Sequence, residues 1–429
     1  MTKTYETASG IEKAILVRVF VKGEDRDESL ELLDELEQLA LTAGADVIEK
    51  IYQELPALNP STLLGKGKLQ EIKELAISED VHLVIFDNEL TPIQMRNLSN
   101  ELQIKILDRS GLILDIFSKN AKTTEAQLEV QLAQMQYLLP RLSRMWAHIS
   151  EQYGGIGTRG PGESQLESDR RVVRHHIQII KDKIKQIDTQ NKEQRKLRKN
   201  IARFALVGYT NSGKSTLMNT ITEANVLVED RLFATLSTTV RQFLLPNNKP
   251  ALISDTIGFI RNLPHHLIAS FRTTLAEAQE SDVLLQVIDI SNQNFRIMID
   301  TVNQTLEDIG IKDKPMIYVF NKIDQLDSLD ILHQVQSEYP QSVFISAGRG
   351  INITNLLERM LKEYEQYHIV FSLLVPYSEG AELNKIYEYC DVIERTDDAD
   401  GTHLQIKIES RNKARMMPII EKYSIDINQ

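Results

Sequence analysis

A glycine-rich segment of eight residues constrains the fold of this chain more than any other feature of the sequence. An apolar run at 202–207 precedes the segment, and a helical pattern at 216–220 follows it. This order of strand, glycine loop and helix predicts the phosphate-binding loop of a doubly wound α/β domain. The segment matches G-x-x-x-x-G-K-[ST] and consists of Gly208, Tyr209, Thr210, Asn211, Ser212, Gly213, Lys214 and Ser215.

Each residue type in this loop has a chemical task. Glycine lets the backbone wrap phosphate groups, so that amide N–H groups point inward at the positive end of a helix dipole. Lys214 adds positive charge at the β- and γ-phosphates and is a candidate catalytic residue, while Ser215 places its hydroxyl on Mg²⁺. The loop therefore predicts a nucleoside triphosphate site with Mg²⁺ as cofactor, but it does not choose the base.

Two later segments predict that the base is guanine. The carboxylate of Asp324 can accept from guanine N1–H and from the exocyclic 2-amino group together. Adenine has no donors there and would leave a buried carboxylate unpaired. The segment after the run 342–345 resembles the backbone loop that contacts guanine O6. The members of the two segments are Asn321, Lys322, Ile323 and Asp324, and then Ser346, Ala347 and Gly348.

A D-x-x-G segment adds contacts to the metal and the phosphates. Asp255, Thr256, Ile257 and Gly258 follow a short apolar run at 251–254. We expect Asp255 to bind Mg²⁺ through a water molecule and the N–H of Gly258 to contact the γ-phosphate. Both are candidate catalytic residues.

A threonine that coordinates Mg²⁺ is expected between the phosphate loop and the D-x-x-G segment. Three threonines compete for this role, and the residue pattern alone does not choose among them. Any that do not bind the metal belong to an ordinary polar loop. The segment consists of Phe233, Ala234, Thr235, Leu236, Ser237, Thr238 and Thr239.

The residue after the D-x-x-G segment departs from small regulatory GTPases. Those proteins place a glutamine near this position to orient the attacking water, whereas this chain has Phe259 followed by Ile260. Because phenylalanine cannot orient water, either intrinsic hydrolysis is slow or another residue or a partner surface completes the site. The structural alternative is that Phe259 simply packs beneath the segment.

Strand and helix patterns divide the chain into four expected domains. Apolar strand runs alternate with helical patterns at the N-terminus, which predicts a parallel-sheet α/β domain. Two long helical patterns, 123–145 and 166–200, flank a glycine-rich loop at 153–163 and predict an antiparallel helical hairpin. The expected domains are an α/β domain at 1–120, the hairpin at 121–200, the doubly wound phosphate-binding domain at 201–365 and a small α+β domain at 366–429.

Local signals predict helix ends in the first domain. Ser29 is the expected N-cap of a helix that stops at Gly44, and Thr91 is expected to open another helix with Pro92 at its first position. A short helix is expected from Leu69. The preceding basic segment, 65–68, is either a plain turn or a second phosphate contact.

Charge is distributed unevenly along the chain. The net charge of −12 argues against non-specific binding to nucleic acid. Between Arg170 and Arg203, however, twelve Lys and Arg residues stand against three Asp and Glu. Such a run is either a solvated helix face or a surface with salt-dependent affinity for nucleic acid.

Composition predicts a cytoplasmic protein. Cys390 is the single cysteine, so no disulfide can form within the chain. The first ten residues lack the layout of a signal peptide, and no apolar run has the roughly 18 residues that a membrane span needs. We expect a monomer without a membrane span.

Segments outside the nucleotide motifs resemble HflX-type GTPases. The resemblance covers about residues 11–365. Shorter segments that contribute to it lie at 138–142, 233–236 and 263–265. The segments that carry it most strongly are NPSTLLGKGK at 59–68, FDNEL at 86–90, DRSGLILDIF at 108–117, and GTRGPGESQLE at 157–167 with DRR at 169–171.

This resemblance implies a ribosome-associated GTPase that binds the large ribosomal subunit and acts on stalled or idle ribosomes. It implies that the helical linker and its glycine-rich loop reach ribosomal RNA, and it favours Thr235 as the Mg²⁺ ligand. Two departures are visible: Tyr153 replaces the first of three loop glycines, and Leu236 with Ser237 replaces the usual residues before the paired threonines.

Two other functions compete with a ribosomal GTPase. In the first, nucleotide controls binding to a protein partner, and hydrolysis is incidental. In the second, the N-terminal α/β domain binds a further nucleotide. The favoured interpretation is an enzyme that converts GTP and water to GDP and phosphate and binds the large subunit in a nucleotide-dependent way.

Overall fold

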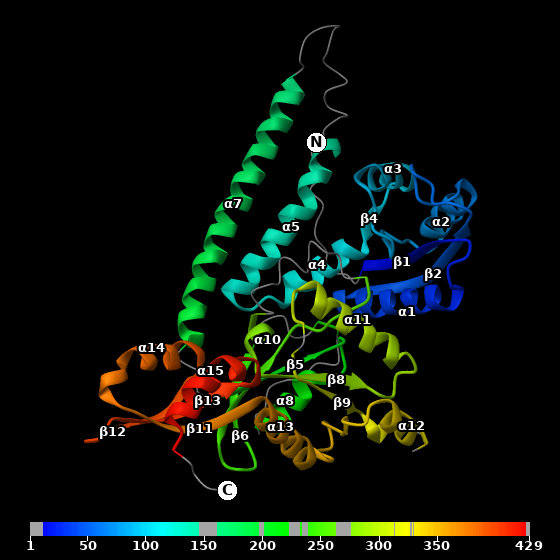
Figure 1. The fold of residues 1–429 in the computed structure, drawn as a ribbon. Coiled ribbons are helices and arrows are strands. Elements are labelled where there is room, and N and C mark those ends of the chain that lie inside the picture. Colours follow the sequence, from blue (N-terminus) through cyan, green and yellow to red (C-terminus); the bar gives the residue numbers. More distant parts are fainter. Residues whose placement is uncertain are drawn as a thin grey trace. The chain divides into compact units, whose positions relative to one another are not determined.

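The structure is a computed structural model that describes residues 12–145, 161–196, 201–222, 232–233, 239–262, 276–312, 314–326, 328 and 330–425. The chain forms two compact units (Figure 1). The first comprises Met1–Ile187, Glu229–Ser237 and Ile260–Arg272, and the second comprises Asp188–Val228, Thr238–Phe259 and Thr273–Gln429.

The first unit contains a four-stranded parallel sheet, as the alternating pattern predicts. The strand order is β2-β1-β3-β4, so the chain reverses its direction of winding between β1 and β3. Seven consecutive side chains of β1 are buried, which is typical of a strand covered on both faces. The strands are β1 (Glu12–Val21), β2 (Ala45–Leu55), β3 (Leu83–Phe86) and β4 (Lys105–Asp108).

Four helices cover this sheet. Helices α2 and α3 share one apolar core with it, and α1 packs on the opposite face together with α4. In Figure 1, α1 lies below the sheet, and α2 and α3 lie above it. The helices are α1 (Arg26–Ala43), α2 (Lys66–Ser78), α3 (Pro92–Leu102) and α4 (Arg109–Asn120).

Most of the predicted helix ends are confirmed, and one is wrong. Thr91 and Gln94 form a reciprocal capping box at the start of α3, and Gly44 ends α1 in the left-handed conformation with φ of 90°. Asp25, not Ser29, caps α1: its carboxylate accepts from the N–H of Asp27, whereas Ser29 is buried inside the helix. Asp is as good an N-cap as Ser, and it lies where the chain is still extended.

Helix α2 begins earlier than predicted. Gly65 is its N-cap, so the lysines of the 65–68 segment belong to the first helical turn rather than to a loop. Lys68 pairs with Glu71 at 2.7 Å.

Two long helices follow, α5 (Thr124–Met145) and α7 (Pro161–Lys196). Helix α5 packs against α3 and α4. Helix α7 begins at Pro161, so the last residues of the predicted glycine loop are already helical, which suits proline at a first helical position. The predicted apolar stripe is confirmed: Ile180 is buried, Val173, Ile177, Ile184 and Ile187 are half-buried, and most residues around them are exposed.

The second unit contains the predicted doubly wound sheet, with strand order β10-β9-β8-β5-β7-β6. All neighbouring strands pair in parallel except β6, which is an antiparallel edge strand that the sequence pattern did not predict. The strands are β5 (Ala202–Gly208), β6 (Thr239–Leu244), β7 (Pro250–Asp255), β8 (Val283–Asp289), β9 (Met316–Asn321) and β10 (Val343–Phe344).

Helices cover both faces of this sheet. One apolar core joins it to α8 and α13, and a second core joins it to α11 and α12. The helices are α8 (Lys214–Thr222), α10 (Ala276–Glu280), α11 (Phe295–Asp308), α12 (Asp330–Glu338) and α13 (Ile353–Tyr367), with a 3₁₀ turn η1 (Ile323–Gln325) after β9.

The C-terminal residues form the expected small α+β arrangement. Its antiparallel sheet has the order β11-β13-β12, and α14 and α15 share its apolar core. The elements are β11 (His368–Val375), η2 (Tyr377–Glu379), α14 (Gly380–Tyr389), β12 (Asp391–Asp397), β13 (Thr402–Glu409) and α15 (Ser410–Tyr423). Among the described residues, no helix is long and apolar enough to span a bilayer.

Candidate functional site

The predicted phosphate loop connects the end of β5 to the start of α8. Gly208 has φ of 151°, and a Cβ atom there would lie 2.3 Å from the carbonyl oxygen of Val287. Gly213 has φ of 92°, and a Cβ there would lie 2.2 Å from Nδ2 of Asn321. Only glycine fits either position, because the backbone conformation and the space both exclude a side chain. The two glycines thus set the path of the loop.

Lys214 is the first residue of α8 and is buried inside this loop. Its ammonium group donates to the carbonyl oxygens of Gly208 and Tyr209, at 3.1 and 2.8 Å. Burial lowers the pKa of Lys214 to about 8, and the nearby carboxylate of Asp255 opposes that shift. A desolvated cation at a helix N-terminus gains strongly from an anion, so the position suits a phosphate group.

The structure brings together the two oxygen groups that the sequence assigns to the metal. Ser215 Oγ donates to Asp255 Oδ2 at 2.6 Å, and Asp255, the last residue of β7, is 2% exposed. Hydroxyl and carboxylate oxygens suit Mg²⁺, which is usually held by few protein groups together with substrate phosphates. Among the described residues, no group of three His, Cys, Asp or Glu side chains could hold a metal ion.

The D-x-x-G segment lies against the phosphate loop. A Cβ atom on Gly258 would lie 3.1 Å from Lys214 Nζ and 2.8 Å from Thr210 Cγ2, so glycine permits this close approach. The hydroxyl of Thr256 donates to the carbonyl of Leu206 at 2.6 Å, and Ile257 is buried. These two side chains therefore belong to the interior of the sheet.

Phe259 continues this segment along the phosphate loop. Its N–H donates to Gly208 O at 3.1 Å, and its carbonyl accepts from Thr210 N at 2.8 Å. Its side chain is 3% exposed. This geometry supports the structural alternative, in which Phe259 packs into the protein and takes no part in orienting water.

Asn321 joins the phosphate loop to the second predicted guanine segment. Its Nδ2 donates to the carbonyl of Ser212, and its Oδ1 accepts from the N–H of Ala347, both at 2.9 Å. The side chain is 2% exposed. Both ends of the amide are thus used within the protein, so that Asn321 holds the two loops at a fixed spacing.

Asp324 lies in η1, beside the segment that begins at Ser346. The Ser346 hydroxyl, and then the Arg349 guanidinium and Lys322, hold the pKa of Asp324 below its usual range. Arg349 Nε lies 3.1 Å from Asp324 Oδ2. The carboxylate is therefore ionised at neutral pH, as an acceptor for two guanine N–H groups must be.

Two charged residues at this site were not predicted from the sequence. Arg349 directly follows Gly348, and Asp289, at the end of β8, pairs with Lys322 at 2.7 Å. Lys322 has a left-handed backbone with φ of 64°, and Ile323 packs against an apolar core. Asp289 could have been predicted as a site residue, because it lies at the carboxyl end of a parallel strand, where ligands bind in such sheets.

The segment that should supply the Mg²⁺ threonine is only partly described. Residues Ala234, Thr235, Leu236, Ser237 and Thr238 lie outside the described residues. Phe233 is described and belongs to the first unit. Its side chain is buried, and its φ is 57°, a left-handed conformation that is rare for an aromatic residue.

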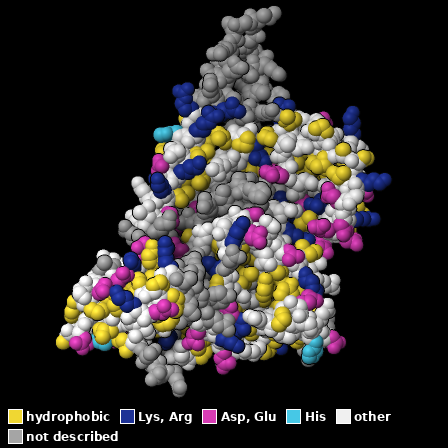
Figure 2. Space-filling view, viewed as in Figure 1, with side chains coloured by type: hydrophobic (Ala, Val, Ile, Leu, Met, Phe, Trp, Pro, Cys, Tyr) yellow, Lys and Arg dark blue, Asp and Glu magenta, His cyan; other side chains and the backbone are white. Residues whose placement is uncertain are grey.

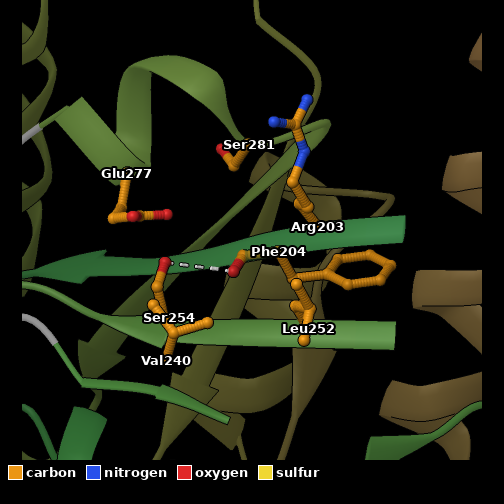
Figure 3. A pocket seen from close by; sticks show the side chains of 7 residues that line it. All are labelled: Arg203, Phe204, Val240, Leu252, Ser254, Glu277 and Ser281. Atoms are coloured by element: carbon orange, nitrogen blue, oxygen red, sulfur yellow. Dashed lines mark hydrogen bonds between the residues drawn. The ribbon is translucent and has the colours of Figure 1, made fainter. Parts of the chain in front are cut away.

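A pocket in the second unit is separate from this site (Figure 3). It lies at the start of β5, whereas the phosphate loop follows the end of that strand. Ser254 Oγ donates to Phe204 O at 3.3 Å within it. Its lining residues are Arg203, Phe204, Val240, Leu252, Ser254, Glu277 and Ser281.

The fold and the site together define a P-loop GTPase. Three family models match consecutive parts of the chain: GTP-binding GTPase N-terminal at 30–118, GTP-binding GTPase Middle Region at 120–198, and 50S ribosome-binding GTPase at 203–322. The GTPase HflX of Flavobacterium psychrophilum is 44% identical over 411 residues, which are 91% of this chain and 97% of the relative. The chain belongs to the HflX family of GTPases; it binds guanine nucleotide and hydrolyses GTP.

Two further relatives, both named GTPase HflX, agree with this assignment. GTPase HflX of Caldanaerobacter subterraneus is 42% identical over 97% of this chain and 95% of the relative. GTPase HflX of Escherichia coli is 36% identical over 96% of this chain and 98% of the relative. A crystal structure of a GTP-binding protein from Sulfolobus solfataricus in complex with GDP is 25% identical, with a TM-score of 0.43, and covers 83% of this chain and 99% of that chain.

Replacing Gly213 with alanine tests the close approach in the phosphate loop. We expect Gly213→Ala to lower the free energy of unfolding by about 1–3 kcal/mol, the cost of a left-handed non-glycine residue with a clash, and to abolish GTP binding. Urea denaturation and fluorescent-nucleotide titration measure the two effects. Gly67→Ala is the matched control, since Gly67 lies in α2 with open space around it. If the two variants had the same stability and the same affinity for GTP, Gly213 would not be a position of close approach in the phosphate loop.

The lowered pKa of Lys214 predicts a pH dependence of stability without nucleotide. Between pH 8 and 10.5 the unfolded chain retains the Lys214 proton that the folded chain has lost, so stability rises with pH. Relative to Lys214→Met, the wild type should gain roughly 3 kcal/mol of unfolding free energy over that window, at about 1.4 kcal/mol per pKa unit. Urea denaturation at a series of pH values measures it. Parallel pH profiles for the two proteins would show that Lys214 titrates normally.

Proposed function

We propose that this GTPase binds the large ribosomal subunit in a nucleotide-dependent way and acts in the rescue, splitting or recycling of ribosomes. The observation that carries the proposal is the basic, solvent-exposed surface of α7, which belongs to the proposed hairpin domain 121–200. Figure 2 shows Lys and Arg side chains along the region of this helix. The exposed basic residues include Arg171, Arg174, Lys181, Lys183 and Lys185.

The chemistry of this surface suits ribosomal RNA. The residues of the apolar stripe of α7 are half-buried or buried, and the exposed basic residues lie outside that stripe. Lysine and arginine bind RNA phosphates by releasing counterions, so the affinity of such a surface falls steeply with salt. The match to a family model described as a 50S ribosome-binding GTPase supports this partner. A ribosomal partner also implies a cytoplasmic location.

In the proposed reaction, protein groups position GTP for attack by water. Lys214 and the backbone of the phosphate loop would hold the β- and γ-phosphates, and the N–H of Gly258 would contact the γ-phosphate. Ser215 and Thr235 would hold Mg²⁺, with Asp255 binding through a water molecule. The ion would neutralise negative charge on the phosphate oxygens.

Asp324 is proposed to select guanine. We expect Asp324→Asn to weaken GTP binding by about 100-fold or more, because a carboxylate that pairs with two N–H groups contributes a few kcal/mol. Xanthine presents an acceptor in place of the 2-amino group, so the variant should prefer XTP. Competition titration with GTP and XTP measures the change. If the affinity for GTP were unchanged, Asp324 would not contact the guanine base.

Ribosome sedimentation tests the proposed partner. The protein should co-sediment with large subunits in the presence of a non-hydrolysable GTP analogue and less with GDP. Raising the salt concentration should release it. We expect Lys181→Gln, Lys183→Gln and Lys185→Gln together to reduce binding by at least tenfold, because three phosphate contacts are lost.

The matched control carries the same change at three exposed lysines elsewhere, Lys22, Lys249 and Lys312. This control should sediment like the wild type. If the wild type fails to sediment with large subunits in every nucleotide state, the ribosomal proposal is wrong, and a nucleotide-controlled protein partner takes its place.

A further inference from the structure

We propose that the hydroxyl group of Thr210 takes part in GTP hydrolysis by holding the attacking water beside the γ-phosphate. The proposal concerns the second unit alone, in which the phosphate loop and the D-x-x-G segment are both described. It rests on the proposed position of the γ-phosphate. It extends that proposal by naming the group that takes the place of the glutamine found in small regulatory GTPases.

Two hydroxyl groups of the phosphate loop are buried and have no hydrogen-bond partner in the part of the chain that the structure describes. They belong to Thr210, which is 6% exposed, and to Ser212, which is 1% exposed. A buried hydroxyl without a partner costs free energy, because it has lost its bonds to water and gained none in return. Such a group calls for an explanation, for example a bound water molecule or a catalytic role.

The surroundings of the two hydroxyl groups differ. A Cβ atom on Gly208 would meet Ser212 Oγ at 3.2 Å and the carbonyl oxygen of Val287 at 2.3 Å, so the Ser212 hydroxyl lies on the side of the loop near β8. A Cβ atom on Gly258 would instead meet Thr210 Cγ2 at 2.8 Å. The Thr210 hydroxyl is bonded to the same carbon atom as that methyl group. It therefore lies close to the glycine of the D-x-x-G segment.

Lys214 also approaches Gly258. A Cβ atom on this glycine would lie 3.1 Å from Lys214 Nζ. The Lys214 ammonium and the N–H of Gly258 are the two groups proposed to contact the γ-phosphate. Burial does not separate Thr210 from the nucleotide, because Lys214 is also 6% exposed. The Thr210 hydroxyl therefore lies beside the groups that would hold the phosphate at which water attacks.

Phe259 fixes the backbone of Thr210. The N–H of Thr210 donates to the Phe259 carbonyl at 2.8 Å, and the N–H of Phe259 donates to the Gly208 carbonyl at 3.1 Å. Threonine is also stiff about its first side-chain dihedral angle, so the hydroxyl has few positions available. The residue that stands near the usual glutamine position thus contributes through its backbone, by holding the residue that carries the hydroxyl.

The Thr210 hydroxyl would act on the water and not on the nucleotide. Its oxygen accepts a hydrogen bond from the water. The water oxygen bonds to the γ-phosphorus, while the bond from that phosphorus to the bridging oxygen of GDP breaks. Both protons of the water leave with the phosphate, as dihydrogen phosphate, and Thr210 keeps its own proton. Because the contribution is orientation, its loss should slow the chemical step and leave nucleotide binding unchanged.

Thr210→Val tests this role, since valine keeps the shape of the side chain and lacks the hydroxyl. We expect kcat for GTP without ribosomes to fall about tenfold or more, because an interaction that acts in the transition state is lost. KM and the affinity for a non-hydrolysable GTP analogue should not change. Thr210→Ser restores the hydroxyl and should hydrolyse GTP like the wild type. Single-turnover hydrolysis and fluorescent-nucleotide titration of the full chain measure these effects.

Stability gives a second readout. Because the Thr210 hydroxyl has no partner among the described residues, Thr210→Val should raise the urea midpoint of the nucleotide-free protein or leave it unchanged. Thr305→Val is the matched control. Thr305 is 8% exposed in the same unit, and its hydroxyl donates to the carbonyl of Thr301 at 2.7 Å. The control should lower the urea midpoint and leave kcat unchanged.

A wild-type kcat in Thr210→Val would overturn the proposal, and so would a fall in kcat that Thr210→Ser shares. If Thr210→Val fails to fold, Thr210→Ala is judged by the same criteria. Lys214→Met separates this result from the proposed nucleotide site. If Lys214→Met binds GTP like the wild type, the γ-phosphate does not lie at this site. If it loses GTP binding while Thr210→Val hydrolyses GTP normally, only the role of the hydroxyl is rejected.

Discussion

The nucleotide site depends on the side-chain amide of Asn321, which fixes two loops at once. Its two polar atoms bond the carbonyl of Ser212 and the N–H of Ala347. The amide nitrogen lies so close to Gly213 that no side chain fits there. A buried amide bonded at both ends holds a definite distance, because breaking either bond leaves a polar group without a partner inside the protein. The phosphate loop and the loop beside Asp324 are therefore positioned relative to each other before any ligand binds.

The parts of the site that the sequence predicted are those fixed by local backbone chemistry. Gly208 and Gly213 adopt conformations that favour glycine, and the apolar run before them could only be a buried strand. The stripe on α7 was predictable from local sequence as well, since its apolar residues recur at helical spacing and are less exposed than most residues around them. The proximity of Ser215 to Asp255 followed from the motif order, because the carboxyl ends of parallel strands lie along one edge of the sheet.

The parts that were missed depend on contacts between distant residues. Most of α4 is buried, including Leu112, Ile113, Leu114, Ile116 and Phe117, so its sequence lacks the alternation of apolar and polar faces that identifies a surface helix. Arg109 is separated from its partners Asp87 and Glu35 by 22 and 74 residues. No local pattern indicates such pairs. The cap of α1 was misplaced for a simpler reason: Asp25 and Ser29 are both good capping residues four positions apart, and only the backbone decides between them.

The two backbone hydrogen bonds of Phe259 determine where the chain beyond the D-x-x-G segment can bend. They connect this residue to Gly208 and Thr210 of the phosphate loop. The chain leaves the second unit directly after Phe259 and enters the first unit at Ile260. Because both the N–H and the carbonyl of Phe259 are hydrogen-bonded, the backbone can rotate only about the dihedral angles that come after this residue. The buried side chain of Phe259 adds to these two bonds, so the direction of the chain can change only at the residues that follow it.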